Sequence, residues 1–203
     1  MKRCKNKPLY LNELQIEAMI KRYLITDPSF YGSDAISCAH RLLDVLQRHQ
    51  VDFICLRDKA QKDYRTFVSH VLQRLPQDLH VKILLHGDYE QAYALGLYGV
   101  HLPSNAFDKI KKAKALGLFV VVSTHQMHEA LHAEKEGADA VTYSPIFESP
   151  GKGVPVGLEK LKEINDRISI KCFALGGIVT SKHVEACEAL NVYGFASIRF
   201  FLD

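Results

Sequence analysis

The sequence predicts a single (β/α)8 barrel, or TIM barrel, in which a parallel sheet closes on itself inside a ring of helices. Two observations support this prediction. Eight short apolar segments alternate with amphipathic helical patterns over almost the whole chain. The chain also has only 203 residues, 47% of them hydrophobic, which suits one domain spanning residues 1–203. An open doubly wound sheet typically has fewer strands.

The stretch over residues 120–153 holds the clearest β-α-β unit. A run of β-branched residues ends at Ser123, Thr124 and His125, an amphipathic helical pattern follows, and the apolar segment 140–144 leads into a Pro/Gly loop. Parallel strands need such a crossover. Since chemistry in these barrels collects at the carboxyl ends of the strands, the polar residues after each expected strand are the functional candidates.

Each expected element follows from a local pattern. Apolar and β-branched runs predict strands over residues 22–27, 51–56, 81–85, 99–102, 118–123, 140–144, 168–175 and 193–198. Apolar residues at helical spacing predict helices over residues 11–20, 35–49, 64–75, 89–95, 103–116, 158–167 and 180–190, with one more between the fifth and sixth strands. Asp88 is expected to cap the helix from 89, and Thr180 or Ser181 the helix that ends at 190. Residues 28–34 are expected to form a loop.

The end of the chain is too short for a closing helix. Only residues 199–203 follow the eighth expected strand. The helix over 11–20 is therefore the candidate to cover this gap, or else to pair with a second subunit. A homo-oligomer is left open by the sequence.

Composition excludes some classes of partner. The formal net charge is +3 and charges of both signs are interspersed, so nothing demands a nucleic acid, although a small anionic substrate would suit the chain. The sequence shows no long apolar run and no signal-peptide pattern, so we expect a cytoplasmic protein without a membrane span. Five cysteines lack C-x-x-C spacing, which favours reduced, buried thiols.

Residues after the seventh and eighth strands have the chemistry of a phosphate site. Gly176 and Gly177 let backbone N–H groups approach an anion, and the following helix would direct its dipole toward the same place. The eighth strand ends beside them at residues Ala196, Ser197, Ile198 and Arg199. Phosphate commonly binds at these two loops of a barrel. The alternative is that the two glycines only make a tight turn.

Three cations are expected in one ring at the barrel mouth. Arg57 and Lys59 follow the second strand, and Lys152 lies in the loop after the sixth, where Ser149 offers a hydroxyl. Cations at strand ends can hold the anionic part of a substrate. The alternatives are solvated surface cations and, for Ser149, a turn residue.

His125 ends the fifth strand and is the candidate acid/base, because an imidazole ordinarily transfers protons near neutral pH. Histidine and aspartate also follow the neighbouring strands, at His86, Asp88 and His101. A metal cluster there is the less favoured alternative, because His101 sits inside a short strand and is expected to face the helices, while Asp88 serves as a cap. No metal ligand is assigned.

Six segments between residues 22 and 198 resemble one superfamily, in order and with its spacing. They are YLITD, LRDK, GVHL, VSTH, GADAVTYSPIFESPGK and ALGGI. The chain resembles the superfamily of thiamine phosphate synthase and the TenI thiazole tautomerases. The resemblance implies a phosphorylated thiazole bound by Ser149, Lys152, Gly177 and the region of Ile198. The synthase joins this thiazole to a pyrimidine pyrophosphate carried by Mg²⁺.

The sequence departs from the pyrimidine and metal pattern of the synthases. Cys55 and Ser104 replace two glutamines, His86-Gly87 replaces Asn-Asp, Ala106 replaces the second metal aspartate, Gly151 replaces a threonine, and Arg199 replaces a serine. Magnesium in such a site needs carboxylates, and both are gone. Asp88 and Asp108 lie near the lost positions, so a shifted ligand is conceivable.

The departures favour a TenI-like tautomerase without cofactor, with His125 as acid/base. Mg²⁺ would be required only for the second interpretation, a thiamine phosphate synthase, and a non-catalytic phosphate-binding regulatory barrel is the third. In the tautomerase, Arg57, Lys59 and Ser123, which match pyrimidine-pyrophosphate contacts of the synthases, would serve a thiazole carboxylate or have no role.

Overall fold

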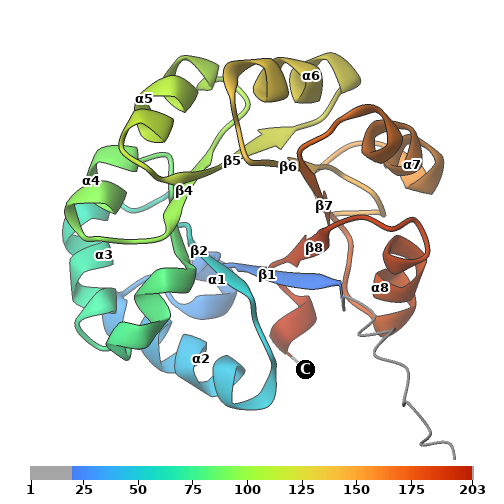
Figure 1. Cartoon of the computed structure of the whole chain (residues 1–203). Helices are drawn as coiled ribbons and strands as arrows, with labels where there is room; N and C mark the ends of the chain where they lie inside the picture. Colours follow the sequence, from blue (N-terminus) through green and yellow to red (C-terminus); the bar gives the residue numbers. More distant parts are fainter. Residues whose placement is uncertain (1–19, 203) are drawn as a thin grey trace, which may run out of the picture.

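The computed structural model describes residues 20–202 and contains a closed barrel of eight parallel strands (Figure 1). Each strand pairs with its neighbours in sequence, and β1 pairs with β8 to close the ring. The strands are β1 (Lys21–Ile25), β2 (Phe53–Leu56), β3 (Ile83–His86), β4 (Gly99–Leu102), β5 (Phe119–Thr124), β6 (Ala140–Tyr143), β7 (Lys171–Leu175) and β8 (Gly194–Ser197). The (β/α)8 prediction is therefore confirmed.

Helices form the outer ring of the barrel (Figure 1). They are α2 (Ala35–Arg48), α3 (Tyr64–Leu72), α4 (Tyr89–Ala94), α5 (Ile110–Ala115), α6 (Met127–Glu136), α7 (Gly157–Arg167) and α8 (Ser181–Glu188). The expected caps are present: the Asp88 side chain accepts from the Gln91 N–H, and the Thr180 side chain accepts from the His183 N–H. None of the helices in the described range is long and apolar enough to cross a membrane.

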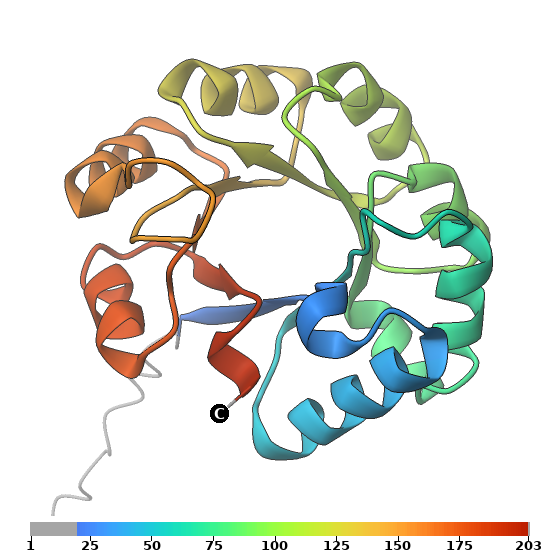
Figure 2. The same cartoon turned by 180° about the vertical axis from the view of Figure 1, so that it is seen from behind.

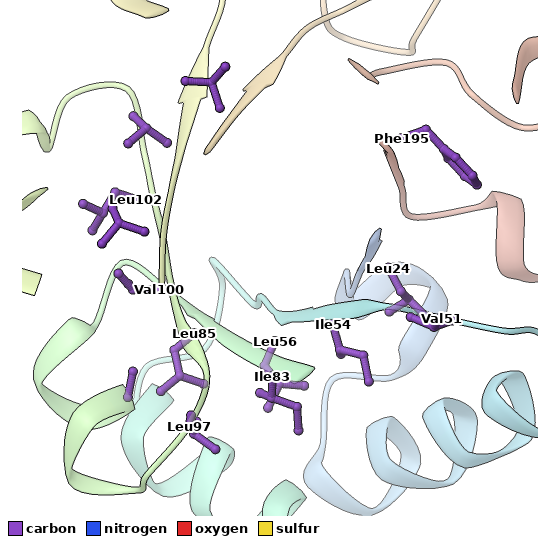
Figure 3. Packing of buried hydrophobic residues seen from close by; sticks show 14 of the residues in the cluster. Leu24, Val51, Ile54, Leu56, Ile83, Leu85, Leu97, Val100, Leu102 and Phe195 are labelled. Atoms are coloured by element: carbon purple, nitrogen blue, oxygen red, sulfur yellow. The ribbon is translucent and has the colours of Figure 1, made fainter. Parts of the chain in front are cut away.

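Alternate residues of each strand fill two separate cores. Leu24, Ile54, Leu85 and Val100 point outward and are fully buried against the helices (Figure 3). Each such side chain contributes roughly 1.5–3 kcal/mol through its removal from water. Residues at the alternate positions, such as Tyr23 next to Leu24, fill the barrel interior. Whether a strand residue points outward or into the barrel therefore decides which polar side chains can reach a site at the end of the barrel.

Aromatic rings fill the amino-terminal end of the barrel. Phe53 lies between Phe119, at 6.0 Å between ring centroids, and Phe173, at 5.6 Å. The Lys171 ammonium lies 5.5 Å from the centroid of the Tyr193 ring and 5.8 Å from that of Phe119, within cation–π range. Because these rings fill the amino-terminal end of the barrel interior, a ligand pocket in that interior can form only at the carboxyl-terminal ends of the strands.

Three segments contain short helices that differ from the sequence-based expectation. The loop over 28–34 contains a short helix, α1 (Pro28–Tyr31), which lies on the same face of the barrel as the loop after β6 (Figure 2). A 3₁₀ helix, η1 (Gln77–Lys82), occupies the expected start of the third strand, so β3 begins at Ile83 and not at Val81. Val81 is exposed and belongs to η1. Another, η2 (Phe107–Lys109), precedes α5, which begins at Ile110 rather than near 103.

The region after β8 holds a short 3₁₀ helix, η3 (Phe200–Leu202). Phe201 is fully buried and its ring stacks on Phe195, 5.9 Å between centroids. This turn gives the end of the chain a buried anchor. We expected a helix over residues 11–20 to cover this gap. Residues 11–19 of that helix lie outside the described range.

Candidate active site

A pocket opens at the carboxyl ends of the strands, as the barrel fold predicts. Eleven of the twelve predicted site residues line it: Arg57, Lys59, Ser123, His125, Ser149, Lys152, Gly176, Gly177, Ser197, Ile198 and Arg199. The exception is Ala196, whose side chain is fully buried in the core inside the barrel.

His125 stands at the rim of the pocket with one ring nitrogen fixed. Its Nδ1 lies 3.0 Å from the carbonyl oxygen of Ser144 and 3.3 Å from the Ser144 hydroxyl. A carbonyl oxygen only accepts hydrogen bonds, so Nδ1 carries the proton and Nε2 of the neutral ring has the lone pair. Nε2 is therefore the atom of His125 that can act as a base.

The two glycines after β7 are required by close backbone contacts. Gly176 and Gly177 have φ values of +97° and +71°. A Cβ atom on Gly176 would lie 2.7 Å from Pro145 Cα, and one on Gly177 would lie 2.4 Å from the Glu148 carbonyl oxygen. Both contacts are with the backbone, which cannot move aside like a flexible side chain. Glycine is needed here for positive φ and for space.

Backbone N–H groups at this corner are available for an anion. The N–H groups of Gly177, Ile178, Ile198 and Arg199 donate to no acceptor within residues 20–202. Such groups next to a helix start are a common anion site. The Ser197 hydroxyl, by contrast, is already used: it donates to the Ile178 carbonyl at 2.7 Å and accepts from the Phe200 N–H at 3.1 Å. Ser197 thus links the loops after β7 and β8.

The three predicted cations, Arg57, Lys59 and Lys152, line the same pocket. Their mutual repulsion contributes to a change in the pKa of Lys59. Burial lowers the pKa of Lys59, and the positive charges of Arg57 and Lys152 lower it further. Arg57 is held by Asp27, with Nη1 2.9 Å from Oδ2. The Lys152 backbone N–H donates to the Ser149 carbonyl at 3.1 Å, which makes the turn that carries both residues.

Two histidines lie deeper in the pocket. His101 is only 3% exposed and faces the barrel interior, because Val100 and Leu102 occupy the outward positions of β4. The expectation that His101 faces the helices is therefore wrong. His86 ends β3, and its Nδ1 is buried without a hydrogen-bond partner in the described structure. Burial lowers the pKa of His86 to about 4, with Arg57 and Lys59 adding to the shift.

The described side chains that line the pocket do not form a metal site. Asp88 does not line the pocket: it caps α4 and pairs with Arg65, Nε to Oδ2 2.7 Å. Neither Asp nor Glu is among the pocket residues in the described range. The same residues contain no cluster of three or more His, Cys, Asp or Glu side chains that could hold a metal ion. The side-chain oxygen atoms of the described residues that line the pocket are all serine hydroxyls, whereas Mg²⁺ is ordinarily held by carboxylates.

Sequence reasoning missed two contributors. Ser144 orients His125, and Tyr23 contacts His101, with the hydroxyl 3.0 Å from Nδ1. Ser144 stood at the end of an expected strand, so its place beside His125 could have been inferred from the pairing of β5 with β6. Tyr23 sits within β1, and no sequence signal marks it as facing inward.

The fold and the pocket define a (β/α)8 barrel with a cationic pocket at the end of the barrel where active sites of this fold lie. The sequence pattern of the thiamine monophosphate synthase family matches residues 22–201. The chain therefore belongs to this family, which includes the thiamine phosphate synthases and TenI proteins.

Individual relatives agree with this membership. The chain is 32% identical over 185 residues to a putative thiamine-phosphate synthase 2 of Aquifex aeolicus, covering 89% of this chain and 97% of the relative. It is 30% identical over 174 residues to a thiamine-phosphate synthase of Shouchella clausii, covering 82% and 81%. The fold is similar to that of a thiamine phosphate pyrophosphorylase from Pyrococcus furiosus, with a TM-score of 0.72, 23% identity, and coverage of 89% and 86%.

Proposed function

We propose that the pocket binds a phosphorylated thiazole and that the protein is a TenI-like thiazole tautomerase. The geometry of His125 is the observation that carries this proposal. A neutral ring with its proton on Nδ1 offers the Nε2 lone pair to a substrate. After Nε2 takes a proton, the Ser144 carbonyl still accepts from Nδ1 and stabilises the positive ring.

The reaction needs only proton transfer. Isomerising a thiazole tautomer to its aromatic form removes a proton from one carbon and returns one to another carbon, so a single base that reaches both positions suffices. His125 Nε2 would take the first proton and the imidazolium would return it, which leaves the enzyme unchanged. No redox partner or leaving group is involved.

The substrate would be anchored by its phosphate. Four free backbone N–H groups gather at the corner of Gly177 and Ile198 and suit the phosphate oxygens. Arg57, Lys59 and Lys152 lie in the same pocket and would attract the anionic ligand from solution. This arrangement supports binding of a phosphate ester that extends from the corner toward His125.

Thiamine-phosphate synthase is the second candidate, and the relatives from Aquifex aeolicus and Shouchella clausii, a putative thiamine-phosphate synthase 2 and a thiamine-phosphate synthase, favour it over the tautomerase. That reaction would require Mg²⁺ to carry a pyrimidine pyrophosphate. The pocket of this chain does not fit the metal well, because Ala106 and Gly87 stand where the synthases place aspartates and no carboxylate lines the described pocket. The proposed proton transfer accordingly uses only side chains of this chain and no Mg²⁺.

One product analysis separates these functions. The purified chain is incubated with the phosphorylated thiazole tautomer alone, and separately with thiazole phosphate, pyrimidine pyrophosphate and Mg²⁺, with and without EDTA. We expect aromatic thiazole phosphate in the first reaction, at a rate that EDTA does not change. Thiamine phosphate formed only without EDTA would establish the synthase instead. If the chain binds the thiazole but forms no product in either reaction, the third interpretation, a non-catalytic regulatory barrel, would be supported.

A further inference from the structure

One peptide group in the loop after β7 is held at both ends by side chains. The carbonyl oxygen of Ile178 accepts a hydrogen bond from the Ser197 hydroxyl at 2.7 Å, and the N–H of Val179 donates to Nδ1 of His183 at 3.4 Å. The carbonyl and the N–H belong to the same planar amide group, so the two contacts together fix its orientation. Ser197 ends β8 and His183 lies in the first turn of α8.

The ring of His183 is itself held by a neighbouring loop. It stacks on the Phe147 ring, with 4.3 Å between the ring centroids and 20° between the ring planes. Phe147 lies in the loop after β6, and its N–H donates to the Gly176 carbonyl at 3.0 Å. The His183 backbone N–H donates to the Thr180 hydroxyl oxygen at 3.3 Å. His183 therefore joins the loop after β6 to the loop after β7.

The contact with Val179 determines which nitrogen of His183 carries the proton. A backbone N–H only donates, so Nδ1 has to offer its lone pair, and the proton of the neutral ring lies on Nε2. This is the reverse of the arrangement in His125, where Nδ1 donates to a carbonyl oxygen. A His183 ring with its proton on Nδ1 would lose the hydrogen bond to Val179.

The orientation of the peptide group matters because an anion is attracted by N–H groups and repelled by carbonyl oxygens. The carbonyl oxygens of Gly176 and Ile178 are bound by Phe147 and Ser197, while the N–H groups of Gly177 and Ile178 are left for an anion. If the peptide between residues 178 and 179 turned over, the Ile178 carbonyl would leave Ser197 and could face the anion.

We propose that His183 is a positioning residue of the phosphate corner, which acts with Ser197 to keep the Ile178 carbonyl away from a bound anion. His183 is not among the described residues that line the pocket, but Val179 is, so His183 acts through Val179. Phosphate binding at this corner rests on the proposed function. The contact between His183 and Val179 does not.

This contact can be tested without any ligand. Two-bond ¹⁵N–¹H correlation spectra of the ¹⁵N-labelled protein at pH 8 distinguish protonated from unprotonated ring nitrogens, and the spectrum of His183→Phe assigns the His183 signals by their absence. We expect an unprotonated Nδ1 and a protonated Nε2 in His183. The Val179 amide hydrogen should exchange with solvent faster in His183→Phe than in the wild type. A protonated Nδ1 in the wild-type protein would overturn the proposal.

Two variants separate the hydrogen bond from the ring stack. His183→Phe keeps a ring to pack on Phe147 but has no acceptor, whereas His183→Asn has a side-chain oxygen in the place of Nδ1 but no ring. In calorimetry, binding of inorganic phosphate should weaken about 10-fold in His183→Phe and stay within about threefold of wild type in His183→Asn.

The control is a second histidine that contacts a phenylalanine. His132 packs on Phe107, with 4.8 Å between ring centroids, and neither residue is among those that line the described pocket. His132→Phe should bind phosphate as the wild type does. Unchanged phosphate affinity in His183→Phe, or equal losses in His183→Phe and His183→Asn, would contradict the positioning role.

Thermal unfolding distinguishes this role from a general effect on stability. Because His183→Phe keeps the ring stack, it should melt at a higher temperature than His183→Asn and still bind phosphate less tightly. If His183→Phe is both the less stable and the weaker binder, its loss of affinity reflects destabilisation and the proposal fails.

A double variant tests whether His183 and Ser197 act on the same peptide group. Ser197→Ala combined with His183→Phe should lose less phosphate affinity than the two single losses combined, because either change alone frees the group. Fully additive losses would contradict a shared action. If the wild-type protein does not bind phosphate, the proposed function fails and the positioning role with it, while the ¹⁵N spectra still decide the contact of His183 with Val179.

Discussion

The Nδ1 atom of His125 lies 3.0 Å from the Ser144 carbonyl oxygen, at the ends of the paired strands β5 and β6. The contact fixes the tautomer of the ring, because a carbonyl cannot donate. The acceptor is a backbone atom, so this contact is separate from that of the Ser144 hydroxyl, which lies 3.3 Å from the same nitrogen. The reactive nitrogen of His125 is thus set by the register of two strands.

Replacing His125 tests its assigned role. In His125→Gln we expect turnover of the thiazole tautomer to fall by about 10²- to 10⁴-fold, the usual contribution of a general acid/base. Affinity for the aromatic phosphate product should stay close to wild type, because the phosphate is held elsewhere. His128→Gln, at an exposed position of α6, is the matched control and should be fully active. Turnover within a few-fold of wild type in His125→Gln would make His125 structural.

Acid should destabilise the protein through His86. The folded pKa of about 4 lies below the ordinary 6.5, so the unfolded chain binds a proton at a pH where the folded protein does not. The folded state is therefore fully stable with respect to this group above about pH 6.5 and loses roughly 3 kcal/mol as pH falls to 4.

Urea unfolding of wild type and His86→Asn at pH 7 and pH 4 measures this effect. The difference in unfolding free energy between the two proteins should shift by roughly 3 kcal/mol in favour of the variant at pH 4. His128→Asn, an exposed histidine, should show no such shift. A pH-independent difference for His86→Asn would show that His86 titrates normally.

The glycine turn after β7 can be tested against a matched glycine. Gly177→Ala and Gly153→Ala both place a methyl group at a φ near +70°, but only the first meets the backbone of Glu148, while nothing lies within 4 Å at Gly153. We expect about 1–2 kcal/mol of destabilisation for Gly153→Ala. Gly177→Ala should cost more and should also weaken binding of inorganic phosphate. Equal stability of the two variants would contradict the close contact at Gly177.

Ser197 should stabilise the phosphate corner without touching the ligand. Ser197→Ala leaves the Ile178 carbonyl and the Phe200 N–H without their partner, which costs about 1–3 kcal/mol. Phosphate affinity should fall as well, because the two loops lose their link. Ser181→Ala, at an exposed serine of α8, provides the control for thermal unfolding and for calorimetry. An unchanged melting temperature in Ser197→Ala would rule out the linking role.

The sequence revealed the barrel because alternation of strands and helices is a property of the chain itself. It revealed the strand-end residues for the same reason, and these include His125 and Gly177. The direction of His101 was mispredicted because the sequence GVHL does not show which side chains point into the barrel. Both neighbours of His101 are apolar and would suit either side of the strand. Only closure of the barrel, with Val100 against the helices, turns His101 inward toward Tyr23.

Short elements were missed for a related reason. The helix α1 has four residues, too few for a periodic pattern, although Asp27 caps it and Pro28 begins it. Its Tyr31 hydroxyl donates to the Ile198 carbonyl at 3.0 Å, a contact across most of the chain. The dual use of Ser197 was missed as well, because a serine at a strand end fits both a ligand contact and an internal one.

The backbone contact between the loops after β6 and β7 limits how this barrel can be re-engineered. Pro145 and Glu148 lie against Gly176 and Gly177 with no room for even a methyl group, whereas nothing lies within 4 Å of the Cβ position at Gly151 or Gly153. The loop after β6 thus has a closely packed base at Pro145 and Glu148 and an open tip at Gly151 and Gly153. Grafts or randomised libraries that aim at a new substrate should begin after Glu148, and any graft reaching further back has to transplant both loops as one unit.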